Sequence, residues 1–391
     1  MVEVWFIALL LIAFYAYLGY GMLIYLLVKI LGKDKMVKSS TYFPSVSLIV
    51  PCYNEGKGLR EKILNTLELS YPEGLLEIIF ICDGSEDGSQ TIPLEFPEVK
   101  TMYSAERKGK LAAMKRAVRQ ASGNILVFCD ANTRLNKKAL EQIVQPYHDR
   151  RVGAVSGEKS ILSSNQQGAG EKGEGMYWKY ESFLKKYDSF LYTLVGAAGE
   201  LISCRMELFQ DLPDNTILDD FMLSMKIAEA GYRVKYVPEA IASEYASANV
   251  GEEVKRKIRI AAGGWQSMFR LRKAINPFHD PVLTFQYVSH RVLRWALIPF
   301  LLIVLLLLNH YLAIQTQELH WYMILGMQYM FYLWAWWGYR WQYKEVSIKG
   351  FFVPYYFTVM NLCAILGFFR WLKGAQPSTW EKAIRIDELS D

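Results

Sequence analysis

The sequence predicts an α/β protein in which a doubly wound, mostly parallel sheet is joined to α-helical transmembrane segments. Three observations support this class. Short apolar runs rich in β-forming residues alternate with helix-compatible stretches between residues 45 and 157. Longer apolar blocks lie on both sides of this region. Three of the short runs end in polar clusters, which is where an open parallel sheet binds its ligand.

The longer blocks predict an integral membrane protein. The 391-residue chain is 52% apolar, and four blocks contain no Asp, Glu, Lys or Arg: residues 4–28, 295–314, 321–339 and 351–369. Each is close to the roughly 20 residues that a helix needs to cross a bilayer. A buried core helix is the alternative for every block. A signal peptide is a further alternative for the first, disfavoured by the acidic start and the length of the run.

Basic residues beside these blocks predict the orientation. Four lysines follow the first block, and nine Lys or Arg residues accompany a single acid between residues 254 and 294. Because basic flanks favour the cytoplasm, we expect the intervening domain to be cytoplasmic, at the plasma (inner) membrane of a bacterial cell. The predicted parts are a transmembrane helix with its basic flank (1–40), the globular domain (41–250), basic interfacial helices (251–294), transmembrane segments (295–372) and a polar tail (373–391).

The last apolar block leaves the topology open. Four full crossings from an outside N-terminus would place the tail outside, yet the basic residues after position 369 favour the cytoplasm. Pro354 and Asn361 raise the alternative that residues 351–369 enter the membrane without crossing it. The sequence does not decide between these two arrangements.

Cysteine usage and net charge exclude several classes of protein. Five cysteines, four of them inside apolar runs, show no metal-ligand spacing and predict buried reduced thiols. The formal net charge of +5 comes largely from the flanks of the globular domain. Aromatic residues are sparse within those flanks, so we expect contact with membrane lipids and no nucleic-acid partner.

The globular domain alternates strands and helices in a regular order. Continuous apolar strands separated by helices predict a parallel sheet that is covered on both faces. Helices are expected up to residue 70, over 107–121 and over 137–148, and a polar loop over 163–175. The predicted strands are residues 46–51, 76–82, 99–104, 125–129 and 152–157.

The ends of these strands carry the candidate chemistry. Asp130 and Asn132 follow the strand "ILVFC", and oxygen ligands at this spacing can hold Mg²⁺ or Mn²⁺, which would neutralise a diphosphate. Each cluster also has a structural interpretation. "DGSEDGS" suits a capping turn, "RKGK" suits a solvated helix start, and Asp130 suits a helix N-cap. Their occurrence at successive strand ends favours a binding site, and the sequence contains no P-loop.

Seven segments between residues 50 and 295 stand out by their order and spacing. The segments are "VPCYNE", "CDGSEDGS", "RKGKLAAMKRA", "FCDANTRL", "VGAAGELISCRMELF", "ILDDFMLSMKIAEAGYRVKYVPEA" and "SHRVLRW". Together they resemble the family 2 glycosyltransferases, in particular the membrane-embedded branch of hyaluronan, cellulose and poly-N-acetylglucosamine synthases. The resemblance covers roughly residues 45–295 and implies a GT-A fold, a nucleotide-sugar donor (most often a UDP-sugar) and inversion at the anomeric carbon.

The resemblance also implies roles for individual residues. Tyr53, Glu55 and Asp83 would line the nucleoside pocket, and Lys110 would approach the nucleotide. Asp130 matches the first acid of the family's DxD metal motif. Asn132 stands where many members have a second acid, so metal affinity would depend more on the diphosphate itself.

"LDD" at residues 218–220 carries the expected general base. By the resemblance, Asp220 would take the proton of the acceptor hydroxyl in an in-line displacement, and Asp219 would orient Asp220 or the acceptor. The structural alternative is a pair of acids in the first turn of a helix over residues 221–230. That role needs only one acid.

One motif departs from the processive members, which carry QxxRW after the base. The matching segment here is "AAGGW", which keeps Trp265 and lacks the Gln and Arg. Trp265 can stack on an acceptor sugar or anchor the membrane surface. Arg259, with Arg256, can contact the diphosphate or lipid headgroups.

Three functions remain after these observations. The favoured one is transfer of one or a few sugars to a lipid-linked or glycan acceptor at the cytoplasmic face. The alternatives are a processive polysaccharide synthase that secretes its polymer, in which a homo-oligomer can widen the narrow channel, and an inactive nucleotide-sugar-binding partner. Asp83, Asp130 and Asp220 together argue against the inactive form.

Overall fold

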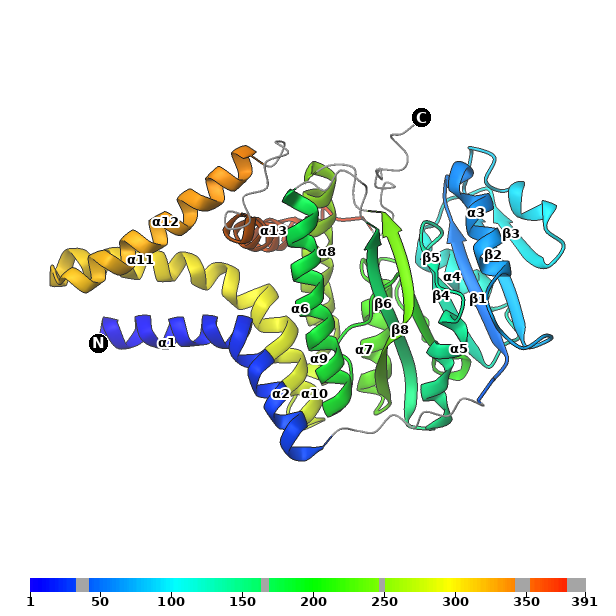
Figure 1. The fold of residues 1–391 in the computed structure, drawn as a ribbon, viewed down its shortest axis with the longest axis horizontal. Coiled ribbons are helices and arrows are strands. Elements are labelled where there is room, and N and C mark those ends of the chain that lie inside the picture. Colours follow the sequence, from blue (N-terminus) through cyan, green and yellow to red (C-terminus); the bar gives the residue numbers. More distant parts are fainter. Residues whose placement is uncertain (33–41, 163–168, 246–249, 342–351, 378–391) are drawn as a thin grey trace.

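The computed structural model describes residues 1–32, 42–162, 169–245, 250–341 and 352–377. A curved sheet with helices on both faces forms one end of the molecule, and long helices project from the other (Figure 1). Most of the basic flank expected within residues 1–40 and most of the polar tail lie outside the described residues.

The sheet is mixed, and its strand order is β3-β2-β1-β4-β7-β6-β8-β5. Four pairings in it are parallel and three are antiparallel among the described strands, so the prediction of a mostly parallel sheet is confirmed. The strands are β1 (Val46–Cys52), β2 (Leu76–Asp83), β3 (Val99–Ser104), β4 (Ile125–Cys129), β5 (Arg134–Leu135), β6 (Val152–Leu162), β7 (Leu201–Arg205) and β8 (Arg233–Tyr245).

Two apolar cores, one on each face, hold the sheet. Apolar runs such as β4, buried at all five positions, supply side chains to both faces in alternation. Phe128 faces the core under α4 (Lys110–Val118) and α7 (Asp219–Glu229), and Val127 faces the core under α3 (Gly56–Leu67) and α5 (Ala139–Val144). The five predicted strands are present, whereas β5, β7 and β8 were not predicted.

A long helix, α6 (Ala169–Leu191), joins the sheet to the membrane helices. The prediction of a loop over 163–175 is wrong for residues 169–175, which begin this helix; residues 163–168 lie outside the described part. Several glycines in the segment favoured the loop, but contacts of α6 with α2 (Tyr20–Leu31), β8 and α13 outweigh this local preference.

Among the described residues, three helical stretches are long and apolar enough to cross a membrane: Val2–Leu31, Pro281–Thr316 and Val353–Leu372. They contain α1 (Val2–Phe14) with α2, α10 (Pro281–Tyr287) with α11 (Ile298–Thr316), and α13 (Phe352–Leu372). The block expected at 321–339 forms α12 (Leu319–Trp341), which is outside this set because Trp and Tyr replace many aliphatic residues. Two π-helical segments, Tyr15–Gly19 and Val288–Leu297, lie where the first two stretches bend, and Tyr15 Oη and Ser289 Oγ are 2.8 Å apart there.

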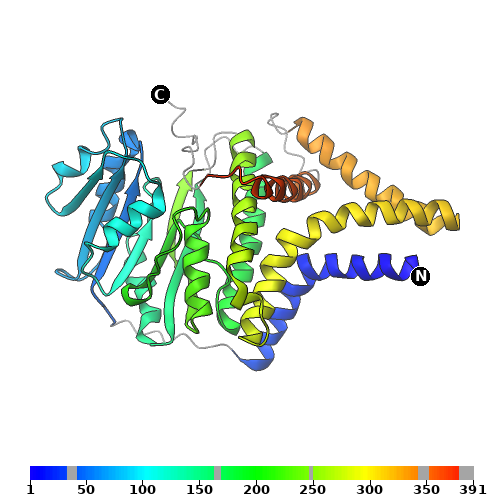
Figure 2. The same cartoon turned by 180° about the vertical axis from the view of Figure 1, so that it is seen from behind.

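Helix α13 runs in a different direction from the other membrane helices. It is seen nearly end-on, whereas α1, α11 and α12 extend away from the sheet (Figures 1 and 2). It packs along the amphipathic α8 (Val250–Arg270), and a Cβ on Gly367 would lie 2.4 Å from Ala261 Cβ. Helix α13 is continuous, so Pro354 and Asn361 do not break it.

Candidate functional site

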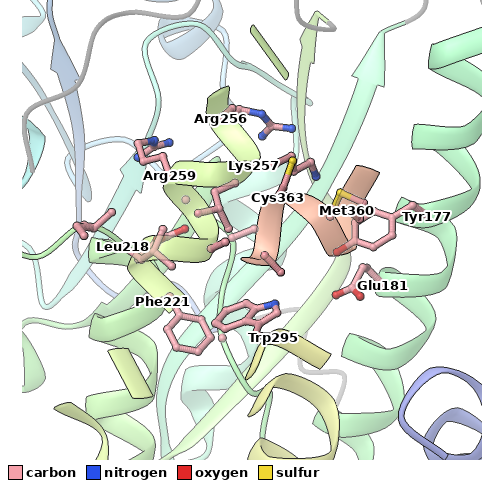
Figure 3. A pocket seen from close by; sticks show the side chains of 18 of the residues that line it. Tyr177, Glu181, Leu218, Phe221, Arg256, Lys257, Arg259, Trp295, Met360 and Cys363 are labelled. Atoms are coloured by element: carbon pink, nitrogen blue, oxygen red, sulfur yellow. The ribbon is translucent and has the colours of Figure 1, made fainter. Parts of the chain in front are cut away.

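A cavity of about 820 Å³ separates the edge of the sheet from the membrane helices. Its size lies within the range of pockets that bind small molecules. Residues from β8, α6, α7, α8, α13 and the π-helical segment 288–297 line it, together with Asp130 just after β4, as Figure 3 shows for part of the wall. Ten Lys and Arg residues and seven Asp and Glu residues are among the described residues of this lining.

Asp130, Asp219 and Asp220 meet Lys110 at the sheet end of the cavity. Lys110 Nζ donates a hydrogen bond to Asp130 Oδ1 at 2.6 Å. Gly199 leaves the space that this cluster needs, because a Cβ there would lie 2.8 Å from Asp220 Oδ2 and 3.4 Å from Lys110 Nζ. Two acids separated by 90 residues are therefore brought together around one ammonium group.

The electrostatics of this cluster suit proton transfer. Burial, followed by the neighbouring Asp219 carboxylate, raises the pKa of Asp220 to about 7. Burial also raises the pKa of Asp130, and the Lys110 ammonium partly offsets this. Burial acts to lower the pKa of Lys110, but Asp130, Asp219 and Asp220 raise it above its ordinary value. A carboxyl with a pKa near neutrality can accept a proton efficiently at cellular pH.

The local structure explains why Asp219 and Asp220 face the cavity. They are the first two residues of α7, whose N-cap position, Leu218, makes no side-chain capping bond. Asp219 Oδ2 is buried and has no hydrogen-bond partner among the described residues. The structural alternative, in which the acids simply cap the helix, leaves this oxygen unexplained.

Asp83 lies behind the cavity wall and is absent from its lining. Its Oδ2 accepts hydrogen bonds from the backbone N–H groups of Lys108, at 2.9 Å, and Gly109, at 2.6 Å, and its Oδ1 pairs with Arg116. Gly84, with φ +71°, allows the same loop to approach closely. Asp83 therefore fixes the loop that presents Lys110, and its expected contact with a nucleoside remains a prediction.

Tyr53 and Glu55 lie at the end of β1, next to this loop. The guanidinium carbon of Arg107, a residue of the cavity wall, is 3.6 Å from the centroid of the Tyr53 ring. The backbone N–H of Glu55 donates to Ser89 Oγ at 2.9 Å and ties β1 to the segment after β2. Neither Tyr53 nor Glu55 belongs to the lining of the large cavity.

Two other predicted residues lie outside the lining of the cavity. Asn132, the expected partner of Asp130 in a metal site, does not line the cavity. The ring of Trp265 packs between α8 and α13, with its centroid 4.7 Å from that of Phe368 and 5.9 Å from that of Trp371. The expected contacts of Asn132 with a metal and of Trp265 with an acceptor sugar remain predictions.

Arg259 does reach the cavity, as Figure 3 shows. Burial lowers its pKa, and the nearby Arg256 acts in the same direction, whereas Asp219, Asp220 and Asp130 oppose both effects. Its guanidinium therefore lies in the field of the three carboxylates. This position suits contact with a negatively charged group beside them.

The sequence analysis missed a buried network behind the carboxylates. Lys159 Nζ lies 2.5 Å from Glu200 Oε1 and also pairs with Glu244, and both acids line the cavity. The ring centroid of Trp178, another lining residue, is 4.9 Å from Lys159 Nζ. Glu200 belongs to the quoted segment "VGAAGE", but nothing in the spacing links it to Lys159. These residues meet only through the sheet.

The membrane end of the cavity has a second missed network. Glu181 on α6 accepts a hydrogen bond from Arg291 Nη1 at 3.0 Å and pairs with Arg294 Nη1 at 2.6 Å. Both arginines lie in "SHRVLRW". Trp295 follows them and contacts Phe221 on α7, with ring centroids 5.3 Å apart.

The residues at the sheet end fit a divalent cation in part. No group of three His, Cys, Asp or Glu residues arranged to hold a metal occurs among the described residues. Asp130 and the unsatisfied oxygen of Asp219 nevertheless provide carboxylate oxygens in a half-buried, acid-rich site. Mg²⁺ is commonly held by one or two carboxylates together with substrate phosphates, so this donor set is sufficient only when a diphosphate completes it.

Comparison with known proteins gives a consistent result. Residues 47–212 match the family model "Glycosyl transferase family 2". The chain is similar to poly-beta-1,6-N-acetyl-D-glucosamine synthase of Staphylococcus epidermidis, 25% identical over 232 residues, which are 58% of this chain and 56% of the relative. An N-acetylglucosaminyltransferase of Rhizobium sp. (strain N33) is 23% identical over 65% of this chain and 60% of its own length. The chain thus spans less than two thirds of these relatives.

A solved structure shares the fold over nearly the whole chain. It is described as mannosyltransferase PcManGT from Pyrobaculum calidifontis in complex with GDP-Man and Mn²⁺. The TM-score is 0.73 at 23% identity, and the match covers 95% of this chain and 99% of that one. The likeness therefore extends beyond the sheet to the helices at the other end of the molecule.

Proposed function

Because residues 47–212 form a glycosyl transferase family 2 domain, we propose that the chain transfers a sugar from a nucleotide-sugar donor, by resemblance a UDP-sugar, to a lipid-linked or glycan acceptor. The transfer inverts the anomeric carbon. The observation that carries the proposal is the meeting of Asp130, Asp220 and Lys110 in one cavity that continues to the membrane helices. Donor and acceptor can therefore meet beside a carboxylate that titrates near neutrality.

In this proposal Asp220 acts as the general base. It accepts the proton of an acceptor hydroxyl while that oxygen forms a bond to the anomeric carbon, and the bond from this carbon to the nucleoside diphosphate breaks. Lys110 and Arg259 offset the negative charge of the leaving diphosphate, and Asp219 orients the acceptor or Asp220. All four of these side chains line the same cavity.

The donor side includes a metal and a nucleoside pocket. Asp130 would hold Mg²⁺ or Mn²⁺ together with Asp219, and Asn132 is the partner proposed from the sequence. The bound cation would supply charge compensation for the diphosphate. Tyr53, Glu55 and Asp83 would form the nucleoside pocket behind Arg107, which lies over the Tyr53 ring.

The helices associate the chain with a membrane. We place the transferase domain in the cytoplasm beside the inner membrane, with α1, α11 and α12 crossing the bilayer and α13 lying along its cytoplasmic face. The direction of α13 in Figures 1 and 2 and its packing on α8 support this arrangement. It also returns the basic residues at the end of α13 to the cytoplasm, so the topology agrees with the distribution of charge.

Transfer of one or a few sugars is the favoured activity because Trp265, the remnant of the processive motif, packs away from the cavity. Polymer synthesis is the second candidate, favoured by the similarity to a poly-beta-1,6-N-acetyl-D-glucosamine synthase. The inactive alternative is disfavoured by the intact cluster around Lys110.

The test is a screen of UDP- and GDP-sugars with the purified full-length protein in detergent, with and without Mn²⁺, followed by measurement of product size. We expect one defined glycolipid. A ladder or a high-mass polymer would favour the synthase instead. Turnover of the Asp220→Asn variant within a few-fold of wild type would overturn the assignment of the base.

A further inference from the structure

Lys185 is a buried cation for which the proposed chemistry has no use. It belongs to α6, its exposed fraction is 3%, and it lines the cavity. In the part of the chain that the structure describes, its Nζ makes no hydrogen bond or salt bridge. The Nζ atom lies over two aromatic rings, 5.7 Å from the ring centroid of Trp178 and 5.9 Å from that of Tyr236. Burial lowers the pKa of this ammonium group. A buried ammonium group that makes no direct hydrogen bond is costly, which points to a ligand.

The sequence of α6 explains how Lys185 comes to face inward. Trp178, Glu181, Lys185 and Asp188 are spaced by three, four and three residues, so they share one face of the helix. All except Trp178, which is partly buried, are nearly inaccessible to solvent. A polar stripe of this kind is stable only when each member has a partner.

The carboxylates around Lys185 are already engaged by other groups. Glu181 forms salt bridges with Arg291 and Arg294, and Glu200 forms one with Lys159. Glu158 accepts a hydrogen bond from Ser182 Oγ at 2.6 Å and another from Tyr236. Asp188 is 2.6 Å from His290 Nδ1 and also accepts from Tyr20. The ammonium of Lys185 is therefore left for something that enters the cavity.

The surroundings of Lys185 define the chemistry of that ligand. The Arg291 and Arg294 guanidinium groups share the single Glu181 carboxylate. The carboxylates of Glu158, Glu200 and Glu181 act on the Lys185 ammonium group from a distance. Three cationic groups therefore gather at this end of the cavity. The adjacent wall comes from membrane helices and contains Tyr17, Phe357 and Met360. Positive charge next to an apolar wall suits a phosphate group that is attached to a long hydrocarbon chain.

We propose that Lys185, with Arg291 and Arg294, binds the phosphate of a lipid-borne acceptor, at a site distinct from the carboxylate cluster that faces the donor. This inference rests on the proposed function, because it assigns the acceptor to the membrane end of the same cavity. The hydrocarbon chain leaves along α13 and the segment Tyr15–Gly19. The hydroxyl that receives the sugar reaches toward Asp220.

The test measures binding of farnesyl phosphate and of farnesol to the full-length protein in detergent by native mass spectrometry. We expect wild type to bind farnesyl phosphate at least tenfold more tightly than farnesol. Lys185→Gln should reduce this preference about tenfold, and Lys185→Arg should retain most of it. Lys186→Gln removes a charge from the exposed side of the same helix and serves as the matched control.

UDP binding and thermal unfolding are measured for each variant to show whether it is folded. A folded variant with a lower preference for farnesyl phosphate has lost the phosphate site and not the fold. If Lys185→Gln folds and binds UDP but keeps the full preference for farnesyl phosphate, the assignment is overturned. If Lys185→Gln does not fold, wild type decides, because equal binding of farnesol and farnesyl phosphate would also overturn it. If inorganic phosphate displaced farnesyl phosphate and the hydrocarbon chain added nothing to the affinity, the site would be one for free phosphate. The assignment of a lipid-borne ligand would then be overturned.

This result is independent of the catalytic assignment. Asp220→Asn should abolish transfer and leave the preference for farnesyl phosphate unchanged. A failure of the proposed function would therefore appear as retained turnover in Asp220→Asn, and a failure of the present inference as retained phosphate preference in Lys185→Gln.

Discussion

The two ends of the cavity are built in different ways. At the sheet end, Lys110 and Asp130 are held by short segments that directly join a strand to the next helix or strand. At the membrane end, Glu181, Lys185 and Arg291 come from helices that meet only through tertiary packing. The sheet end therefore has a local sequence signature, whereas Glu181 and Lys185 at the membrane end have none. The two ends also carry opposite charge, acidic at the sheet and basic at the membrane.

The Asp220→Asn variant should have the largest effect, because it removes the proposed general base from the sheet end of the cavity and leaves the membrane end unchanged. Loss of the base should reduce the rate of transfer about 1,000-fold, within the range for general base catalysis. The same change removes a carboxyl whose pKa in the folded protein is about 7, well above the value of about 3.9 expected in the unfolded chain. Ionisation of this carboxyl lowers the free energy of unfolding from about pH 4 upward and in full above about pH 7, so the variant should gain up to about 4 kcal/mol of stability at pH 8.

Initial rates and thermal unfolding at pH 8 measure both effects. Asp211→Asn, which changes an exposed acid, is the control and should alter neither quantity appreciably. A destabilised and inactive Asp220→Asn variant would mean that the residue has a structural role and would remove the contrast between the two ends.

Lys110→Gln should produce the second largest effect. Without this ammonium group, three carboxylates face the donor diphosphate with less compensation, so affinity for UDP should fall at least tenfold. Calorimetric titration of UDP measures this loss. Binding of farnesyl phosphate at the other end should change less than twofold, and a parallel loss of both affinities would show that the two ends are not separate sites.

The pH dependence should report the sheet end alone. Asp220 must be ionised to accept a proton, so kcat/KM should rise with pH through about 7 and level off above it. Activity at pH 6 should be about tenfold below that at pH 8. A profile that is flat over this range would assign the proton transfer to another group.

Trp265→Phe should have the smallest effect. The ring packs against Phe368 and Trp371 outside the cavity, so transfer by this variant should remain within about twofold of wild type. Trp178→Phe, on the cavity wall, is the comparison and should lower transfer further. A strong loss in Trp265→Phe alone would restore the prediction that Trp265 contacts an acceptor sugar.

The same contrast explains how far the sequence could predict the molecule. Strands β1 to β4 and the approach of Lys110 to Asp130 follow from alternating apolar runs and from polar residues at strand ends. Strand β8 was missed because its residues directly follow a predicted helix and belong to the same quoted sequence segment. Its backbone forms a strand because it pairs with β6, and this long-range pairing cannot be seen in the local sequence pattern. Lys185 could not be predicted, since its isolation depends on which partners its neighbours take.

The paired π-helical segments have a consequence for variation in length. In each segment the backbone winds more widely than in an α-helix, and the helix continues on both sides. The segment Val288–Leu297 carries Arg291 and Arg294. Removing one residue from that segment would allow ordinary α-helical winding there and would leave the residues beyond it on nearly the same face, because the π-helical turn already absorbs one extra residue. Removing one residue from the regular helix of α11 would instead rotate everything beyond it by about 100°. We therefore expect single-residue deletions to be tolerated far better in Val288–Leu297 than in α11.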